Sequence, residues 1–375
     1  MPDVAIVGAG PAGIAAARAV RECGKTAVVF DDNSCAGGQI WRGEDIPLQE
    51  LRASTPVLGP WQLGCGRVIL ATGARELFLP FPGWTLPNVM GAGGLQALVK
   101  SGLPVRDKRI IIAGSGPLLL AVAVTLRKQG AQILFVAEQA PTRQLLLLAR
   151  HPAKLLAGLR LRMELMGIPY RTGCWPVSAE GPDQLLAVTM RQGEETWTER
   201  CDYLACSFGL VPNLELPLLF GCQVRGGFVA VDEQQRTSVP NVFAAGEITG
   251  IGGVEKATAE GRVAGLAAAG KNAHNTPSAF PETLRHAFQL RQELKHLATR
   301  ETIVCRCEDV PLSAIRSFDS WRAAKLQTRC GMGPCQGRIC GPAIEFLCGW
   351  PADSVRPPAF PSTISGLLAE KLLDQ

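Results

Sequence analysis

The fold is decided by Val4-Ala5-Ile6-Val7-Gly8-Ala9-Gly10-Pro11-Ala12-Gly13, which joins an apolar run to a glycine-rich turn. Residues 4–7 predict a buried strand, and the alanine-rich run that continues to residue 21 predicts a helix. In this GxGxxG pattern Gly8 permits the tight turn, Gly10 lets the backbone approach a pyrophosphate, and Gly13 permits close helix–strand packing. The stretch therefore predicts a dinucleotide site at the helix N-terminus.

Other turns along the chain are expected to complete this site, and together they favour FAD, although each alone could be a structural turn. Asp31 ends the next strand, where a carboxylate can accept the ribose hydroxyls. Glu247 ends a later strand and is expected to bind the ribityl hydroxyls, while a helix that opens near Gly253 can face the flavin pyrimidine edge. The remaining turn residues expected near the cofactor are Gly38, Gln39, Thr72, Gly73 and Gly246.

A second strand–turn–helix unit begins near residue 109. Gly114 and Gly116 follow an apolar strand, and Glu138 follows the next strand at the ribose-acid position. Leu119 occupies the third glycine position, where a bulky side chain hinders close helix–strand packing. Three interpretations stay open for this unit: a purely structural dinucleotide fold, a site for an adenine nucleotide such as ATP or AMP, and a functional NAD(P)H site.

Five cysteines crowd one short region near the C-terminus: Cys305, Cys307, Cys330, Cys335 and Cys340. Four thiolates can hold an iron–sulfur cluster, and the glycines between them let backbone N–H groups reach the sulfurs. Structural zinc is the alternative, since four cysteines also suit that metal. Electron transfer beside a flavin favours iron–sulfur. The five cysteines compete for four places, and the other eight cysteines are interpreted as small buried hydrophobic residues.

Composition narrows the class of protein. The 375 residues suggest several domains, and 47 % hydrophobic content with 41 glycines favours an α/β protein. The net charge of +5 is scattered, which argues against nucleic acid. The apolar run at residues 110–126 is interrupted by Gly114-Ser115-Gly116-Pro117, so no transmembrane segment is expected. A chain that goes from Met1 directly into a strand and has 13 cysteines is expected in the reducing cytoplasm, or at the inner face of the membrane.

Several runs resemble the FAD-binding subunits of bacterial amino-acid and opine dehydrogenases, a family with hydrogen cyanide synthase, opine oxidases and dye-linked proline or D-hydroxyproline dehydrogenases. These runs lie at residues 37–42, 71–76, 81–87 and 113–120. Arg42 ends the first run, and the resemblance therefore implies that it also lies at the cofactor. The runs at 305–308 and 331–340 resemble the [2Fe-2S] domain of the bacterioferritin-associated ferredoxin type.

The resemblance implies a ligand set and a partner. It implies that Cys305, Cys307, Cys335 and Cys340 hold a [2Fe-2S] cluster, which leaves Cys330 as the spare. It also implies a second flavoprotein subunit that oxidises the amine, and a downstream acceptor such as a quinone. Two features depart from the family: residues 43–68 form a much shorter stretch than relatives have, and Glu247 replaces the more common aspartate.

The expected architecture is an α/β flavoprotein with two dinucleotide-binding domains and a small C-terminal [2Fe-2S] domain. We predict an FAD domain at 1–100 and 216–275, a second Rossmann-like domain at 101–215, a helical connector at 276–300 and the cluster domain at 301–375. The expected function is electron transfer within a heteromeric dehydrogenase of an amino acid, imino acid or opine-like secondary amine. The alternatives are a self-contained NAD(P)H-dependent reductase and a non-catalytic nucleotide-binding subunit. Catalytic residues stay unassigned, because no histidine, tyrosine or arginine constellation marks a substrate pocket.

Overall fold

The computed structural model describes residues 1–276, 278–351 and 355–368. The chain divides into two compact units. The first contains residues 1–75, 212–281 and the described part of 354–375, and the second contains 76–211 and the described part of 282–353. The chain passes between them at β5 (Ala74–Glu76), β14 (Leu210–Pro212) and α8 (Phe280–Ala287).

A five-stranded parallel sheet forms the centre of the first unit. Its order is β17 (Val242–Ala244), β4 (Val68–Leu70), β1 (Val4–Val7), β2 (Ala27–Phe30) and β3 (Leu51–Arg52). Every residue of β1 and β2 is buried, which explains why both strands read as continuous apolar runs rather than alternating ones. The elements outside this sheet include η1 (Pro60–Gln62), α6 (Glu215–Leu219), β15 (Val224–Arg225), β16 (Phe228–Val229), η3 (Glu247–Thr249) and α12 (Ile364–Leu368).

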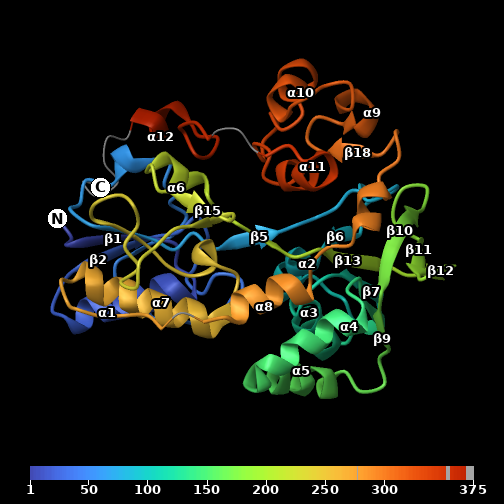
Figure 1. Cartoon of the computed structure of the whole chain (residues 1–375), viewed down its shortest axis with the longest axis horizontal. Coiled ribbons are helices and arrows are strands. Elements are labelled where there is room, and N and C mark those ends of the chain that lie inside the picture. The colour runs from blue at the N-terminus through green and yellow to red at the C-terminus, as the bar shows by residue number, and fades with distance from the viewer. Residues whose placement is uncertain (277, 352–354, 369–375) are drawn as a thin grey trace. The chain divides into compact units, whose positions relative to one another are not determined.

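Two helices of this unit, α1 (Pro11–Glu22) and α7 (Gly253–Ala268), lie side by side (Figure 1). Glycines make the close approach possible. A Cβ added at Gly261 of α7 would lie 2.1 Å from the carbonyl oxygen of Ala12, and one at Gly265 would lie 2.4 Å from that of Ala16. The small residues of both helices therefore let the middle of α7, at Gly261 and Gly265, pack directly against the backbone of α1.

The second unit has its own five-stranded parallel sheet. Its order is β6 (Val89–Gly91), β13 (Tyr203–Ser207), β7 (Arg109–Gly114), β8 (Gln132–Glu138) and β9 (Tyr170–Thr172). Between β9 and β13 the chain forms the antiparallel strands β10 (Cys174–Glu180), β11 (Ala187–Gln192) and β12 (Glu195–Arg200). The helical elements of this unit include α2 (Ala92–Lys100), α3 (Leu118–Lys128), α4 (Thr142–Leu145), η2 (Leu146–Arg150) and α5 (Pro152–Glu164). Both sheets confirm the predicted α/β, Rossmann-type fold.

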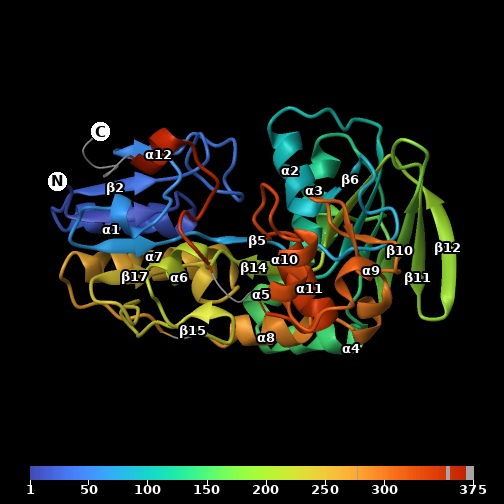
Figure 2. The same cartoon turned by 90° about the horizontal axis from the view of Figure 1, so that it is seen from above.

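The cysteine region packs within this second unit. After η4 (Gln292–His296) come β18 (Ile303–Cys305), β19 (Val310–Pro311), α9 (Leu312–Ile315), α10 (Trp321–Thr328) and α11 (Cys340–Cys348). Its three helices lie together in both views (Figures 1 and 2). The indole N–H of Trp84 donates a 2.6 Å hydrogen bond to the carbonyl of Ile303, which ties this region to the loop before β6.

The last described segment, 355–368, belongs to the first unit rather than to the cysteine region with which the sequence grouped it. The backbone N–H of Ala359 donates to the carbonyl of Leu58 at 2.7 Å, and Ala359 is buried in the core cluster that contains Val57. Residues 352–354 and 369–375 of the predicted cluster domain lie outside the described residues.

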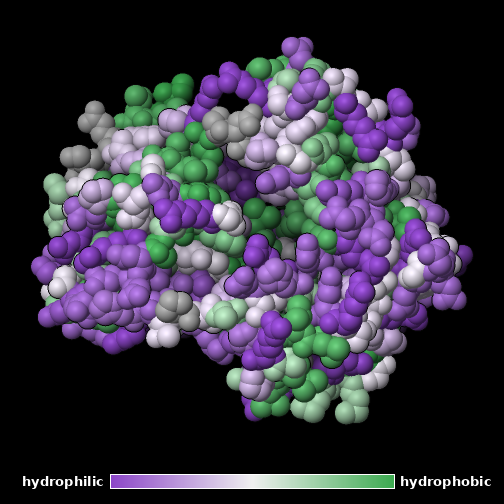
Figure 3. Space-filling model, in the orientation of Figure 1, coloured by the Kyte–Doolittle hydropathy of each residue, from purple (hydrophilic) through white to green (hydrophobic). Residues whose placement is uncertain are grey.

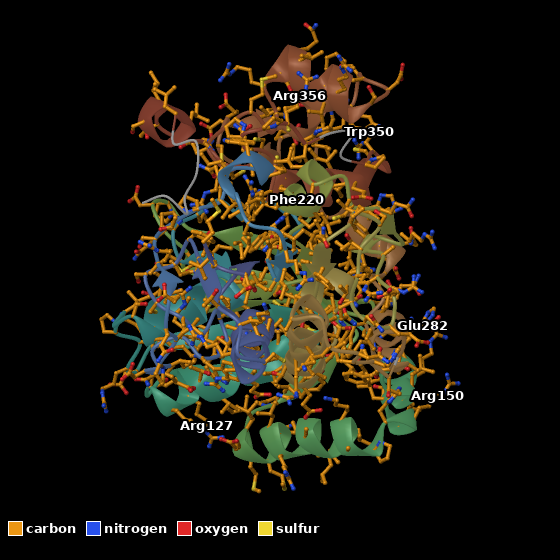
Figure 4. The ribbon with its side chains drawn as sticks, turned by 90° about the vertical axis from the view of Figure 1, so that its left-hand side faces the viewer. Arg127, Arg150, Phe220, Glu282, Trp350 and Arg356 are labelled. Atoms are coloured by element: carbon orange, nitrogen blue, oxygen red, sulfur yellow. The ribbon has the colours of Figure 1, made fainter. Side chains whose placement is uncertain are left out.

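Helix α5 exposes an apolar face. Leu155, Leu156, Leu159 and Met163 are between 36 % and 60 % exposed, and apolar surface is visible there in Figure 3. Figure 4 labels Arg127 and Arg150 toward the two ends of this helix. No residue of α5 is fully buried by the described part of the chain. Among residues 1–276, 278–351 and 355–368, no helix is long and apolar enough to cross a membrane.

Candidate functional site

The three glycines of the first turn have different structural surroundings. Gly8 has φ +106°, and a Cβ there would lie 2.2 Å from the carbonyl oxygen of Ala71. A Cβ at Gly13 would lie 1.8 Å from the carbonyl oxygen of Gly8. A Cβ at Gly10, in contrast, would have no described atom within 4 Å. Gly8 and Gly13 are therefore required by the fold itself, whereas Gly10 borders open space.

That open space faces the N-terminus of α1. Gly10 is the N-cap residue, Pro11 follows it, and no side chain of the described residues caps the helix. The first turn, Pro11–Ile14, contains no carboxylate, so its partial positive charge is not neutralised. A second turn lies against the same point, because a Cβ at Gly38 would be 3.2 Å from the Cα of Gly10. Gln39 follows in this turn and is exposed. This geometry suits a pyrophosphate.

Asp31 lies beside the glycine turn, as expected. Its carboxylate accepts the N–H of Ala9 at 2.5 Å and both the backbone and side-chain N–H groups of Asn33, at 2.8 and 2.7 Å. The amide oxygen of Asn33 in turn accepts a 2.9 Å bond from the Arg42 guanidinium. The Nε of Arg42 is buried and has no partner among the described residues. An anionic ligand at the neighbouring glycine turn would supply the acceptor that this buried N–H group lacks.

Thr72 and Gly73 pass close to the glycine turn and are held by Asn213. The Thr72 hydroxyl donates to the carbonyl of Asn213 at 2.8 Å, and the Asn213 side-chain amide donates back to the carbonyl of Thr72 at 2.8 Å. Arg75 donates to the same Asn213 side chain at 2.7 Å. Nothing in the sequence pattern singled out Asn213, because its partner lies far away along the chain.

Glu247 has local partners in the structure. Its carboxylate accepts the N–H groups of Gly252 and Gly253, at 3.2 and 2.9 Å, and so stabilises the start of α7. Burial raises its pKa, and the two N–H groups oppose that shift. Its predicted contact with ribityl hydroxyls stays a prediction.

Sequence reasoning missed Glu260, which hydrogen-bonds to the Gly246 turn. The buried carboxylate of Glu260 accepts the N–H of Gly246 at 3.0 Å, the hydroxyl of Thr249 at 2.6 Å and the ammonium of Lys256 at 2.7 Å. The spacing of four residues between Lys256 and Glu260 on a predicted helix was the signal that could have indicated the pair. These contacts fix the Gly246 turn, which lies against Ala12 of α1.

In the second dinucleotide unit the predicted ribose acid is already engaged. Glu138 is fully buried, and it accepts hydrogen bonds from the Gly116 N–H at 2.8 Å, the Ala140 N–H at 2.8 Å and the Ser115 hydroxyl at 3.0 Å. Burial raises the pKa of Glu138 to about 7, although these donors oppose the shift. Leu119 is also fully buried in the helix–sheet core, so α3 accommodates the side chain that stands at the third glycine position.

A segment of the same chain lies against this turn. The Gln139 side-chain amide donates to the carbonyl of Gln289 at 3.2 Å, and the Arg291 N–H donates to the Gln139 side chain at 3.2 Å. The Ser115 hydroxyl also lies 3.3 Å from the carbonyl of Phe288. We call residues 288–291 the strap. A nucleotide bound in the usual way would contact the same turn and the same strand end, so it would compete with the strap.

All five clustered cysteines converge. The sulfur atoms of Cys305, Cys330 and Cys340 lie within 4.8 Å of one another, and all three residues are buried. Cys335 is in side-chain contact with Cys340 and with Cys307, which is exposed. Contact with Cys330 lowers the pKa of the Cys305 thiol to about 2, and contact with Cys340 lowers the pKa of Cys335 to about 5. Contacts with the neighbouring sulfurs raise the pKa values of Cys330 and Cys340, and burial raises the pKa of Cys307, so among the five thiols Cys305 and Cys335 are the ones favoured as thiolates.

The glycines of this region shape a cradle for a group held by thiolates. A Cβ at Gly333 would lie 2.3 Å from the Cβ of Cys307, and one at Gly331 would lie 2.6 Å from the Trp321 ring. The Gly331 N–H also points to the sulfur of Cys305 at 3.4 Å. Crowded sulfurs that accept backbone N–H groups fit an iron–sulfur cluster. The ligand set Cys305, Cys307, Cys335 and Cys340 stays a prediction.

Comparison with protein families finds two matches. The pyridine nucleotide-disulphide oxidoreductase family matches residues 58–261, and an NAD(P)-binding Rossmann-like domain matches residues 6–57. Together they cover both dinucleotide turns.

Among curated proteins, the chain is 30 % identical to hydrogen cyanide synthase subunit HcnB of Pseudomonas aeruginosa, over 89 % of this chain and 90 % of that protein. It is 29 % identical to an opine oxidase subunit of Rhizobium meliloti, over 96 % of this chain and 97 % of that protein. These alignments span 422 and 453 positions, so both relatives have segments that this chain of 375 residues lacks. The resemblance expected from the sequence is confirmed.

Solved structures show the same fold. L-proline dehydrogenase from P. horikoshii aligns with a TM-score of 0.67 and 20 % identity, covering 98 % of this chain and 79 % of that one. Thioredoxin reductase of T. acidophilum aligns with a TM-score of 0.57 and 19 % identity, covering 72 % of this chain and 98 % of that one. The likeness to the proline dehydrogenase extends over nearly the whole chain, including the part beyond the two dinucleotide units.

Proposed function

Because this chain belongs to the pyridine nucleotide-disulphide oxidoreductase family and is a flavin oxidoreductase related to HcnB and to opine oxidase, we propose that it is the electron-transfer subunit of a heteromeric dehydrogenase. In this proposal it carries FAD and one [2Fe-2S] cluster. The complex oxidises an amino acid, an imino acid or an opine-like secondary amine, and the bond oxidised is CH–NH or CH–NH₂.

The observation that carries the proposal is the combination of sites in one chain. An open phosphate-type turn at Gly10 lies in one unit, and a group of three buried thiols, with Cys335 and Cys307 in contact beside it, lies in the other. Oxidation of an amine to an imine releases two electrons and two protons. A flavin accepts both electrons, whereas a [2Fe-2S] cluster accepts one at a time, so the pair connects a two-electron donor to a one-electron carrier. Quinone is the acceptor class that we propose.

The residues of this chain would bind and position the cofactors. The N–H groups at the start of α1 and the Arg42 guanidinium would hold the FAD phosphates, and Asp31 would accept the ribose hydroxyls. Cys305, Cys307, Cys335 and Cys340 would hold the cluster. Substrate oxidation is assigned to a second flavoprotein subunit, in keeping with the two relatives, each of which is itself one subunit of its enzyme.

The rival enzyme function, a self-contained NAD(P)H-dependent reductase, has the family match in its favour. Against it stands the strap, because residues 288–291 contact Ser115 and Gln139 at the turn and strand end that a pyridine nucleotide would use. The rival non-enzymatic function, a structural nucleotide-binding subunit, is favoured by the shortened 43–68 region and by the longer relatives.

Cofactor analysis of the purified chain separates these functions. We expect one FAD and two iron atoms per chain, and a reduced-state EPR signal of the [2Fe-2S] type. Serine at Cys335 or Cys340 should remove the iron while leaving the flavin. Zinc in place of iron would contradict the electron-transfer proposal, and a folded chain without flavin would favour the structural subunit.

A further inference from the structure

We propose that helix α5 is a docking surface for a membrane, and that its exposed apolar face lies on a bilayer of anionic phospholipids. This inference goes beyond the proposed function, since it involves neither the flavin nor the cysteine region. It concerns a face of the second unit that the described part of the chain leaves exposed to solvent.

The exposed side of α5 consists of aliphatic side chains. It contains Leu155, Leu156, Leu159 and Met163, which are 36 %, 50 %, 50 % and 60 % exposed. Because successive residues of an α-helix are about 100° apart, these four side chains lie within about 100° of one face. Leu161, about 200° from Leu159 around the helix, packs instead against the helix–sheet core of the second unit. One apolar side of α5 therefore holds the helix on its unit, and the other is available to a second apolar phase.

Exposed apolar side chains continue beyond both ends of this helix. Leu146, in η2 before α5, is 68 % exposed, and Met166, just after α5, is 74 % exposed. Figure 3 shows apolar surface over this part of the second unit. Single exposed apolar residues are common on protein surfaces, whereas a group gathered on and around one helix marks an interaction site.

Cations surround the apolar face. By the same helical spacing, Arg160 lies at one edge of this face and Arg162 at the other. At the C-terminal end of α5, the guanidinium of Arg127 donates to the carbonyl oxygen of Glu164 at 2.7 Å. Figure 4 labels Arg150 toward the other end of the helix. An apolar strip bordered by cations is the pattern of a helix that lies in the plane of a membrane surface.

Charge complementarity favours an anionic occupant. Residues 142–166 contain five Lys or Arg residues and one acid, Glu164, which pairs with Lys128 at 2.6 Å. Two copies of α5 would bring like charges together, which disfavours a second copy of this chain as the occupant.

Composition favours lipid over an acidic protein. Protein interfaces bury about 20–30 residues a side and are anchored by Trp and Tyr, whereas residues 142–166 contain no Phe, Trp or Tyr. A bilayer requires no matching shape, because its acyl chains accept Leu and Met and its anionic headgroups attract Arg.

The test is cosedimentation of the full purified chain with vesicles of phosphatidylglycerol and phosphatidylcholine, compared with vesicles of phosphatidylcholine alone. We expect binding to the anionic vesicles that weakens as the salt concentration rises. The triple variant Leu156→Gln/Leu159→Gln/Met163→Gln should bind them about a hundredfold more weakly, because each half-exposed apolar side chain contributes about fivefold. Arg160→Gln should weaken this binding by about fivefold.

The matched control is a second triple variant, Leu98→Gln/Leu186→Gln/Leu326→Gln. These three leucines of the second unit are 47 %, 53 % and 61 % exposed, and they lie on α2, in the loop before β11 and on α10. The control should bind vesicles like the wild type. Thermal unfolding of both triple variants shows that each is folded under the conditions of the assay.

Each other outcome assigns the face differently. Failure of the full chain to bind anionic vesicles, or equal binding by the wild type and the α5 triple variant, would overturn the docking role. Dimers of the wild type that form without lipid and that the α5 triple variant loses, with no vesicle binding, would assign the face to a second copy. Binding to the substrate-oxidising subunit that this variant loses, again with no vesicle binding, would assign it to a protein partner.

Vesicle binding requires no cofactor, so this inference and the proposed function fail separately. A chain that binds vesicles through α5 but holds neither flavin nor iron would uphold the inference and overturn the proposed function. A chain that holds both cofactors and does not bind anionic vesicles would do the reverse.

Discussion

Replacing Gly10 with alanine should separate FAD binding from folding. Gly10 has φ −78°, a value that any L-residue adopts, and its added Cβ meets no described atom within 4 Å. The substitution should therefore leave the folded chain intact, or stabilise it by about 0.4–1 kcal/mol through the unfolded state. The same methyl group would occupy the space that the FAD pyrophosphate needs at the start of α1.

The expected loss of affinity follows from the phosphate contacts. A methyl group at Gly10 would push the pyrophosphate away from the helix N–H groups. Charge-assisted hydrogen bonds of this kind contribute about 1.5 kcal/mol or more each, so losing two costs about 3 kcal/mol. Since 1.4 kcal/mol corresponds to about tenfold in a binding constant, FAD affinity should fall by roughly a hundredfold.

The assay is flavin titration of the apoprotein, followed by fluorescence quenching, with thermal unfolding of the apoprotein in parallel. Gly13→Ala is the matched control, because its Cβ would lie 1.8 Å from the Gly8 carbonyl oxygen and should destabilise the fold directly. The reasoning is refuted if the Gly10→Ala apoprotein unfolds like the Gly13→Ala variant, or if it binds FAD with wild-type affinity.

Three further predictions follow from the same contacts. In anaerobic stopped-flow experiments NADH should not bleach the flavin rapidly, because the strap engages Ser115 and Gln139 at the second dinucleotide turn; fast bleaching would restore the reductase function. The purified chain should not oxidise proline or an opine until a second subunit is added, and dye-linked activity of the chain alone would contradict this. Between pH 4.5 and about 7 the folded chain retains on Glu138 a proton that the unfolded chain loses, so stability should fall as the pH rises through this range. Over this range the protonation of Glu138 should change the free energy of unfolding by about 3 kcal/mol. Urea unfolding of Glu138→Gln should therefore show a flatter dependence of stability on pH than the wild type.

The local patterns that could be recognised in the sequence are those whose physical cause is also local. The strand, glycine turn and helix at residues 4–22 follow from an apolar run, a turn that only glycine permits and an alanine-rich segment. Asp31 could be located because it ends the next strand of the same unit. The crowding of five cysteines was likewise visible in the chain itself.

Contacts between distant parts of the chain could not be predicted. Asn213 holds Thr72 across 141 residues, and Gln139 meets Gln289 across 150, and neither pair has a sequence pattern. The environment of Glu138 was also beyond sequence reasoning. The sequence shows that an acid ends the second strand, but it does not show which N–H and hydroxyl groups of the chain that acid will accept from.

The strap connects the second dinucleotide fold to the cysteine region. Directly after it come Leu294 and Leu297, which are buried in the same core as Trp84 and Phe135, and each such side chain stabilises packing by about 1.5–3 kcal/mol. The Trp84 indole then binds the carbonyl of Ile303, two residues before Cys305. A nucleotide that displaced the strap would therefore disturb the segment that leads into the proposed cluster site. If the second unit serves as the platform for the cysteine region, this explains why the chain keeps a dinucleotide fold whose turn is covered by the strap. In the proposed function, electrons would then enter the chain from its partner subunit rather than from NAD(P)H.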